Sequence, residues 1–418
     1  MTDAHSAKPR SAALAFIFVT IALDMLALGM IIPVLPKLVE RFVSGDTARA
    51  AEIFGVFGTA WALMQFFFSP LLGALSDRFG RRLVILVSNF GLGLDYILMA
   101  LAPNVAWLFI GRVISGITAA NIPTAYAYIA DVTPPEQRAK SYGLLGAAFG
   151  IGFILGPALG GVLGAIDPRL PFWVAAGASL ANAVYGVFVL PESLPADRRA
   201  GISWRRANPL GSLLLLRSHP ELSGLATTNF LVNVAHVVFP TVFVLYAGYR
   251  FGWNESAVGV SMAAFGLAST IVQAGMVGQA VELLGERRAL LVGLAFGTVG
   301  MTMFGLATNQ IVFCAAIPIM SLWGFAGPAT QGLMTRRVAP AEQGQLQGAN
   351  NSITGIANLV GPSIFSLVFA HVVAAPDGAV ARGAALHGID FSGAPFLIAA
   401  LMLLASAVFA WRATRPRR

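Results

Sequence analysis

The chain has 418 residues, of which 57% are hydrophobic and only 11% are charged. A soluble globular chain carries roughly 25% charged residues, so this composition excludes an ordinary water-soluble protein. The formal net charge of +8 suggests a nucleic-acid partner, but the basic residues gather in alternate loops between apolar runs. That distribution is a topology signal, and we expect no nucleic acid to bind.

Twelve apolar runs are long enough to cross a bilayer, which takes about 20 residues. They lie at about 13–35, 51–73, 83–102, 106–130, 141–164, 171–190, 222–249, 256–280, 289–308, 311–335, 345–369 and 391–411. An even number of spans puts both termini on one side. The excess of Lys and Arg marks that side as cytoplasmic, so we expect a multi-pass protein of a bacterial cytoplasmic membrane, in contact with lipid.

The chain contains an internal repeat. The stretch Gly73–Arg82 separates two apolar runs, and a looser copy at Gly278–Arg288 lies 205 positions later with the same Gly, acid, Gly spacing. Gly156-Pro157 recurs as Gly361-Pro362 at the same offset. These markers predict an all-α fold of two pseudo-symmetric six-helix bundles, 1–190 and 222–418, joined by a cytoplasmic linker at 191–221. The substrate path would run between them.

Three charged residues lie inside apolar runs of the first half: Asp24, Asp95 and Arg112. A charge at membrane depth is costly and is a functional candidate by default. We expect the two acids to handle protons and substrate, and Arg112 to couple protonation to helix movement by exchanging partners. The alternatives are a static ion pair between Asp24 and Arg112 and a purely structural pair for Asp95.

The first repeated stretch predicts a short polar hinge whose ion pairs hold one face of the protein closed. The gating candidates are Gly73, Asp77, Arg78, Gly80, Arg81, Asp131, Gly156 and Pro157. The glycines would allow a tight loop and close helix packing, and Arg81 would reach Asp131. The alternative for the arginines is a topology signal alone. Glu286 replaces Arg81 in the second copy, which predicts an asymmetric latch.

The fifth run contains Gly156 and Pro157 among many small residues, which favour close helix contact at the interface between the halves or generic packing. The second half offers uncharged polar residues, each equally suited to bridging helices or lining a cavity. The substrate-binding candidates are Asp24, Gln65, Asp95, Asn233, His236, Gln273, Gln331 and Asn351, and Asn350 and Asn358 of the same run as Asn351 are further candidates to line a cavity.

Several functions are not supported. The sequence has no phosphate-binding loop of the GxxxxGK[ST] type and no HExxH metal motif. Its single cysteine, Cys314, excludes an intramolecular disulfide and makes a cysteine metal site implausible. We therefore expect no enzyme activity, no cofactor and no metal, and a monomer that moves a small molecule and protons.

The hinge, the Gly111-Arg112…Gly116 pattern and Gly156-Pro157-x-x-Gly160-Gly161 together resemble the major facilitator superfamily. The likeness is closest to its tetracycline–proton antiporters. The stretches that carry it are Leu23-Asp24, Pro33–Pro36, Ala62–Gln65, Ser76–Arg82, Leu94–Tyr96, Gly111–Thr118, Phe251–Asn254 and Gln345–Gly348. The resemblance implies substrate and proton roles for Asp24 and Asp95, and gating roles for Asp77 and Arg81.

Two positions depart from that group. Gly297 stands where the group has an acid in helix 9, and Ser269 stands where it has a histidine in helix 8. Proton coupling must then depend on the first half, or tetracycline is not the substrate. We expect a proton-coupled exporter of an amphiphilic, drug-like compound. The alternatives are a proton-coupled uptake symporter or facilitator for a small metabolite, and a transporter-like receptor or membrane enzyme.

Overall fold

The computed structural model describes residues 7–118, 121–199, 213, 215–219, 222–339, 342–374 and 391–415. Helices dominate the described residues, which contain no strand. About half of the predicted linker 191–221 lies outside them, since only 191–199, 213 and 215–219 of that segment are described.

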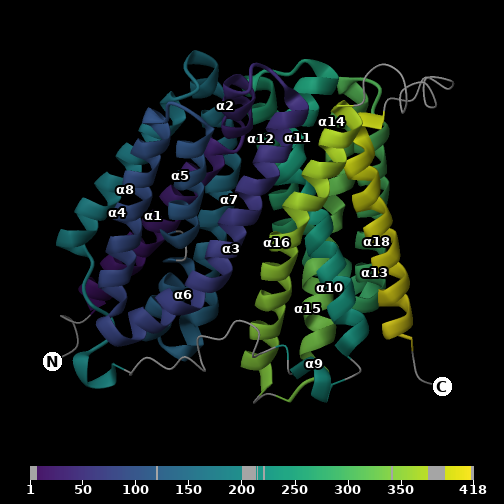
Figure 1. Ribbon diagram of the computed structural model, residues 1–418. Helices are drawn as coiled ribbons and strands as arrows, with labels where there is room; N and C mark the ends of the chain where they lie inside the picture. Colours follow the sequence, from purple (N-terminus) through teal and green to yellow (C-terminus); the bar gives the residue numbers. More distant parts are fainter. Residues whose placement is uncertain are drawn as a thin grey trace. The chain divides into compact units, whose positions relative to one another are not determined.

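The helices follow one another along the chain with short connections (Figure 1). Those of the first half are α1 (Ala7–Ile31), α2 (Leu35–Phe42), α3 (Thr47–Phe79), α4 (Arg81–Leu101), α5 (Val105–Thr118), α6 (Asn121–Val132), α7 (Pro135–Ile166) and α8 (Leu170–Val189), followed by the short η1 (Ala196–Arg198) and α9 (Leu215–Ser218). Those of the second half are α10 (Ser223–His236), α11 (Val238–Phe251), α12 (Glu255–Ile271), η4 (Val272–Met276), α13 (Val277–Leu306), α14 (Gln310–Ser321), η5 (Leu322–Phe325), α15 (Ala326–Thr335), α16 (Gln343–Ala374), η7 (Phe391–Gly393) and α18 (Ala394–Ala413).

Eleven segments of the described chain are long and apolar enough to span a membrane. One of them, Glu255–Leu306, has 52 residues, about twice the length that a bilayer requires. Gly285 interrupts it with a φ of 74°, a conformation that no helix contains. The long segment is therefore two spans that meet at Gly285, which confirms the predicted architecture of twelve spans.

The hinge itself is shorter than predicted. Residues 73–79 form the last turns of α3, and Arg81 already begins α4, so the only break is Gly80 with a φ of 104°. A residue with a Cβ strongly disfavours that conformation, so a single glycine reverses the chain between two helices.

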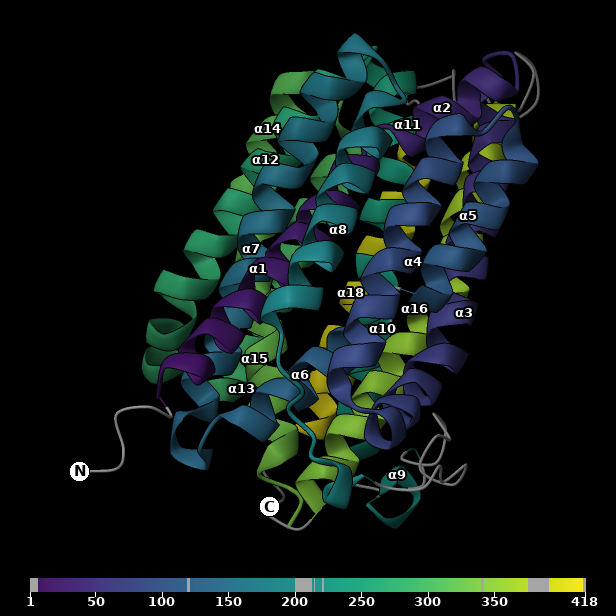
Figure 2. The same ribbon diagram turned by 90° about the vertical axis from the view of Figure 1, so that its left-hand side faces the viewer.

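The first compact unit comprises residues 1–35, 60–208 and 255–263. Within it α1 packs along α7 and α8, and α4 packs along α8 (Figure 2). Its apolar core includes Phe16, Ile17, Ile21 and Tyr128, all almost fully buried. Gly156 lets α7 approach α1, because a Cβ there would lie 2.7 Å from the Cα of Gly29.

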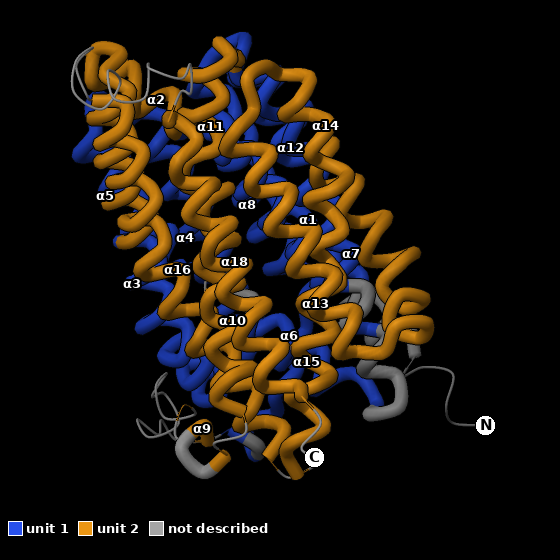
Figure 3. The backbone as a smooth tube through the Cα atoms, turned by 90° about the vertical axis from the view of Figure 1, so that its right-hand side faces the viewer, with its two compact units in different colours: residues 1–35, 60–208, 255–263 blue, residues 36–59, 209–254, 264–418 orange. Residues whose placement is uncertain are grey.

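The second compact unit comprises residues 36–59, 209–254 and 264–418 (Figure 3). Within it α18 packs on α10 and α13, and α10 packs on α16. Aromatic rings fill its core: the ring centroids of Phe304 and Phe313 are 4.4 Å apart, and those of Tyr246 and Phe396 are 5.0 Å apart. Such edge and tilted contacts are the favoured geometry for aromatic pairs.

Each unit includes a piece from the other half of the sequence. In the second unit, the start of α3 lies on α16, with the hydroxyls of Thr59 and Ser363 2.9 Å apart. In the first, the start of α12 lies on α7, where Ser256 donates to the carbonyl of Gly161 at 3.2 Å. The compact units therefore do not coincide with the two halves of the sequence repeat, because each unit takes helix ends from both halves. The sequence boundaries 1–190 and 222–418 stay a prediction.

Candidate functional site

The three in-membrane charges of the first half are buried in the same unit. Asp24 lies on α1, Asp95 on α4 and Arg112 on α5, and their exposed fractions are 6%, 1% and 8%. Asp95 interacts electrostatically with Arg112, and both act on Tyr96, as does Asp24. The fold thus places the predicted acids and their cation in one electrostatic cluster.

Gly111 permits the close approach of α5 to α4. A Cβ at Gly111 would lie 2.9 Å from Oδ1 of Asp95 and 2.6 Å from Cγ of Met99. Arg112, the next residue, directs Nη2 to the sulfur of Met99 at 3.5 Å. Among the described residues, the two carboxylate oxygens of Asp95 have no hydrogen-bond partner, and the Nε of Arg112 has none either.

A buried carboxyl group usually has hydrogen bonds, because desolvation without them costs several kcal/mol. Asp95 has a cation nearby but, among the described residues, no hydrogen bond that fixes its charged form. Such a group can accept a proton without breaking a contact. The arrangement is suited to a carboxyl group that changes protonation state as its surroundings change.

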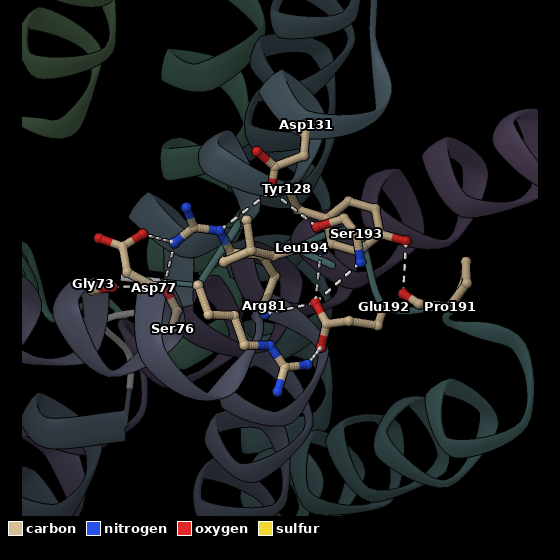
Figure 4. A network of polar contacts seen from close by, with 11 residues as sticks. Gly73, Ser76, Asp77, Arg81, Tyr128, Asp131, Pro191, Glu192, Ser193 and Leu194 are labelled. Atoms are coloured by element: carbon tan, nitrogen blue, oxygen red, sulfur yellow. Dashed lines mark hydrogen bonds and ion pairs between the residues drawn. The ribbon is translucent and has the colours of Figure 1, made fainter. Parts of the chain in front are cut away.

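Arg81 is the centre of a polar network at the end of α3 and the start of α4 (Figure 4). Its Nη1 contacts Oδ1 of Asp77 at 2.6 Å and donates to Ser76, while its Nε lies 3.3 Å from Oδ2 of Asp131. Ser193 donates to the same oxygen of Asp131 at 3.0 Å. The expected contact between Arg81 and Asp131 is present, and its gating role stays a prediction.

Glu192 belongs to this network and was not anticipated from the sequence. Its Oε1 accepts the backbone N–H of Arg81 at 2.9 Å, and its Oε2 lies 3.9 Å from Nη2 of Arg199. Glu192 therefore caps the start of α4, where an anion is favoured by the free N–H groups and the helix dipole. A Cβ at Gly80 would collide with this carboxylate, which gives that glycine a second reason to be there.

Two predicted hinge residues have other surroundings. Gly73 was expected to permit close packing, but a Cβ there would meet nothing within 4 Å. It lies inside α3, and its carbonyl accepts a hydrogen bond from the hydroxyl of Ser76 at 2.7 Å. Gly73 therefore contributes a backbone hydrogen-bond acceptor to the hinge, and its small size is not needed for packing. Arg78 is exposed and lies over the ring of Phe79, 5.3 Å from the centroid, outside the network of Arg81.

The second hinge contains an ion pair of reversed polarity. Oε1 of Glu286 lies 3.0 Å from Nη2 of Arg336, at the end of α15. Beside it, Arg287 donates from Nε to the hydroxyl of Thr414 at 3.1 Å. The expected asymmetry therefore takes the form of an exchange of charges rather than a missing latch.

The glycines of α7 serve two neighbours. Gly156 packs on α1, while Gly161 lies against the backbone of Glu255 at the start of α12. The carbonyl of Pro157 lies so close to Gly259 that a Cβ at position 259 would clash with it. Helix α7 therefore contacts segments from both halves of the sequence within the first unit.

A chain of side-chain amides crosses three helices of the second unit. Asn233 donates to the side chain of Asn229 at 3.0 Å, Asn229 donates to Asn350 at 3.1 Å, and Asn350 donates to Gln331 at 2.9 Å. Thr354 extends it, donating to Asn233 at 3.3 Å. These contacts link α10, α15 and α16.

Only some of the predicted substrate-binding residues belong to the amide chain. Asn233 and Gln331 belong to it, whereas Asn351 is exposed and its neighbour Asn350 takes the bridging place. Consecutive helix residues differ by about 100° in direction, so one of two adjacent asparagines faces a neighbouring helix. Gln65 lies half-buried on α3, in the unit of Asp24 and Asp95, and His236 and Gln273 lie exposed in the second unit.

Comparisons with known proteins agree with this architecture. The family model described as Major Facilitator Superfamily matches residues 17–362 and 225–418. The tetracycline resistance protein of class C from Escherichia coli is 38% identical over 379 residues, which cover 90% of this chain and 94% of that protein. The class E protein from the same species is 38% identical over 352 residues, covering 84% of this chain and 86% of that protein.

Among solved structures, the nucleoside transporter NupG has a TM-score of 0.76 and 13% identity, covering 97% of this chain and 100% of that one. At that identity the likeness concerns the fold alone. The sequence matches span nearly the whole chain and include both halves of the repeat. The chain therefore belongs to the Major Facilitator Superfamily, in the group that contains the tetracycline resistance proteins.

Proposed function

We propose that this chain is a proton-coupled antiporter that exports an amphiphilic, drug-like compound across a bacterial cytoplasmic membrane. The observation that carries the proposal is Asp95, buried at membrane depth beside Arg112 with no hydrogen-bond partner among the described residues. The relatives named for tetracycline resistance support this reading and make tetracycline the first compound to test.

The proposed cycle alternates access by rocking the halves 1–190 and 222–418, joined by the segment 191–221, in a monomer surrounded by lipid. With Asp24 and Asp95 ionised, the cytoplasmic side admits the compound. After rocking, a proton from outside neutralises an acid and the compound leaves. The protonated protein returns to the inward-facing state and releases the proton to the cytoplasm, which leaves the acid ionised again. Arg112 holds the acid ionised until the next proton arrives. The ion pairs of Arg81 keep the cytoplasmic face closed in the outward-facing state.

Charge distribution favours both termini on the cytoplasmic side, because the two ends and the loops that follow even-numbered spans carry 20 of the 27 Lys and Arg residues. The loops after the second, fourth and sixth spans are among them. In the first unit these loops meet at the network of Arg81, Asp131 and Glu192. Because the three loops meet at one network, they lie on the same side of the membrane in the proposed topology.

The driving force is adequate for export. A potential of 100 mV provides about 2.3 kcal/mol per charge, and a pH difference of one unit provides about 1.36 kcal/mol per proton. Because each 1.4 kcal/mol corresponds to a factor of about ten, one proton can sustain a gradient of roughly several hundredfold for an uncharged compound.

The decisive experiment measures proton release from acidified inverted vesicles when tetracycline, and then a panel of cationic dyes and antibiotics, is added. We expect a response with the wild type and none with Asp95→Asn, provided that both proteins are folded and present in equal amounts. Whole-cell accumulation supplies the sign: an exporter lowers it, and an uptake symporter raises it. Raised accumulation, or an undiminished response in Asp95→Asn, would overturn the proposal.

A further inference from the structure

Three spans of the second unit depart from α-helical geometry within their length. One is the joint between α10 and α11, which follows His236. The second is η4, Val272–Met276, a π-helical turn that contains Gln273. The third is η5, Leu322–Phe325, a 3₁₀ turn that contains Trp323. Irregular turns inside membrane helices are frequent at functional sites, because they redirect side chains and backbone groups.

The irregular segments converge. The turns η4 and η5 pack on each other, and a Cβ at Gly324 would lie 3.5 Å from Cγ of Gln273. The rings of His236 and Trp323 are 5.7 Å apart between centroids, at an interplanar angle of 47°. An imidazole, an indole and an amide therefore gather where α10, η4 and η5 meet.

Among the described residues, the side chains of His236, Gln273 and Trp323 make no hydrogen bond to another part of the protein. His236 and Gln273 are exposed, while Trp323 is largely buried and held in place. In contrast, the neighbouring amides of the chain from Asn233 to Gln331 are satisfied by one another.

The place of Trp323 also accounts for Gly297. A Cβ at Gly297 would lie 2.9 Å from Cγ of Trp323 and 3.0 Å from Cδ1 of Leu403. The indole thus occupies the space that a side chain at position 297 would need.

We propose that His236, Gln273 and Trp323 bind a flat, aromatic, hydrogen-bonding part of the exported compound. This inference rests on the proposed export function and names the chemistry of its cargo. Trp323 offers an indole to planar rings, and His236 and Gln273 supply hydrogen bonds at the edges of those rings. A site built without a carboxylate recognises the rings and polar edges of its ligand rather than a positive charge.

The test is equilibrium binding of two planar fluorescent probes, tetracycline and ethidium, to the full-length protein in lipid nanodiscs without a gradient. We expect Trp323→Leu and Gln273→Leu each to raise the dissociation constant roughly three- to tenfold, the range that loss of one aromatic or hydrogen-bond contact gives. Trp323→Phe, which keeps a ring, should stay within about threefold of the wild type. Trp173→Leu, a matched change on α8 of the first unit, should have no effect.

Unchanged binding of both probes in folded Gln273→Leu and His236→Leu would overturn the inference. These side chains are exposed, so their variants remain informative if Trp323→Leu does not fold. Proton release in inverted vesicles is measured in parallel. Export of a compound without planar rings, with no binding of either probe, would overturn this site and leave the antiporter intact. Absence of both binding and proton release would overturn both proposals.

Discussion

Arg81 and Glu286 occupy the same place in the two hinges, 205 residues apart, and carry opposite charges. Their partners, Asp131 and Arg336, are separated by the same 205 residues and are also reversed. Each pair is formed within its own unit, at 3.3 Å in the first and 3.0 Å in the second. The repeat has therefore kept the ion pair at each hinge while exchanging its charges.

The two pairs differ in surroundings, which predicts different responses to charge exchange. Arg81 is only 11% exposed and also contacts Asp77 and Ser76, whereas Arg336 is 75% exposed. We expect a coupling free energy of roughly 0.2–1 kcal/mol between Glu286 and Arg336, typical of exposed pairs. For Arg81 and Asp131 we expect about 1–3 kcal/mol, as for residues in one network.

Double-mutant cycles on the free energy of unfolding measure these coupling energies, and transport by the charge-exchanged pairs tests their role in function. Glu286→Arg with Arg336→Glu should restore nearly wild-type transport. Arg81→Asp with Asp131→Arg should restore only part, because the acid at position 81 would then repel Asp77. Full recovery of transport by the exchanged pair in the first hinge would show that the contacts of Arg81 with Asp77 and Ser76 do not contribute to function.

Gly80 and Gly73 provide a matched comparison in the first hinge. Gly80→Ala should destabilise the protein by about 1–3 kcal/mol, because a residue with a Cβ is strained at a φ of 104° and would clash with Glu192. Gly73→Ala should be neutral or stabilising by about 0.5–1 kcal/mol, since it lies inside a helix with space around it. Thermal unfolding in detergent is the measurement, and equal effects of the two changes would contradict this account.

Asp24 is the second acid of the buried cluster, and its amide variant tests the proposed proton step. Asp24→Asn keeps the shape of the side chain but has no proton to lose, so gradient-driven export should be abolished while the fold is preserved. The exposed Asp197→Asn serves as the control. Transport driven by a pH gradient and thermal unfolding are measured together. Wild-type export by Asp24→Asn would remove Asp24 from the mechanism.

Gly297 should tolerate no larger residue while Trp323 keeps its position. Gly297→Ala is expected to destabilise by about 1–3 kcal/mol through overpacking and to weaken planar-probe binding by displacing the indole. Gly297→Asp should destabilise the protein for the same steric reason. Gly327→Ala is the control, since a Cβ there meets nothing within 4 Å. Unchanged stability and binding in Gly297→Ala would show that the indole has another resting place.

Much of the fold follows from local properties of the sequence. The number of spans is set by the length of the apolar runs, and the break between the eighth and ninth is set by Gly285, whose backbone leaves the helical region. The presence of Asp24, Asp95 and Arg112 within the membrane-spanning segments follows from their places inside those runs. A bilayer imposes the same length and polarity on every span, so these features can be recognised without knowing any neighbour.

The contacts between distant residues were decided by tertiary structure alone. Glu192 caps a helix that begins 111 residues earlier in the sequence, and Asn350 rather than Asn351 joins the amide chain. Trp323 fills the space beside Gly297. Each outcome depends on how far a helix is rotated about its axis and which neighbour it meets, and a run of apolar residues specifies neither. The sequence by itself determined the spans and the charges that lie within them, whereas packing determined which side chains are buried and which meet.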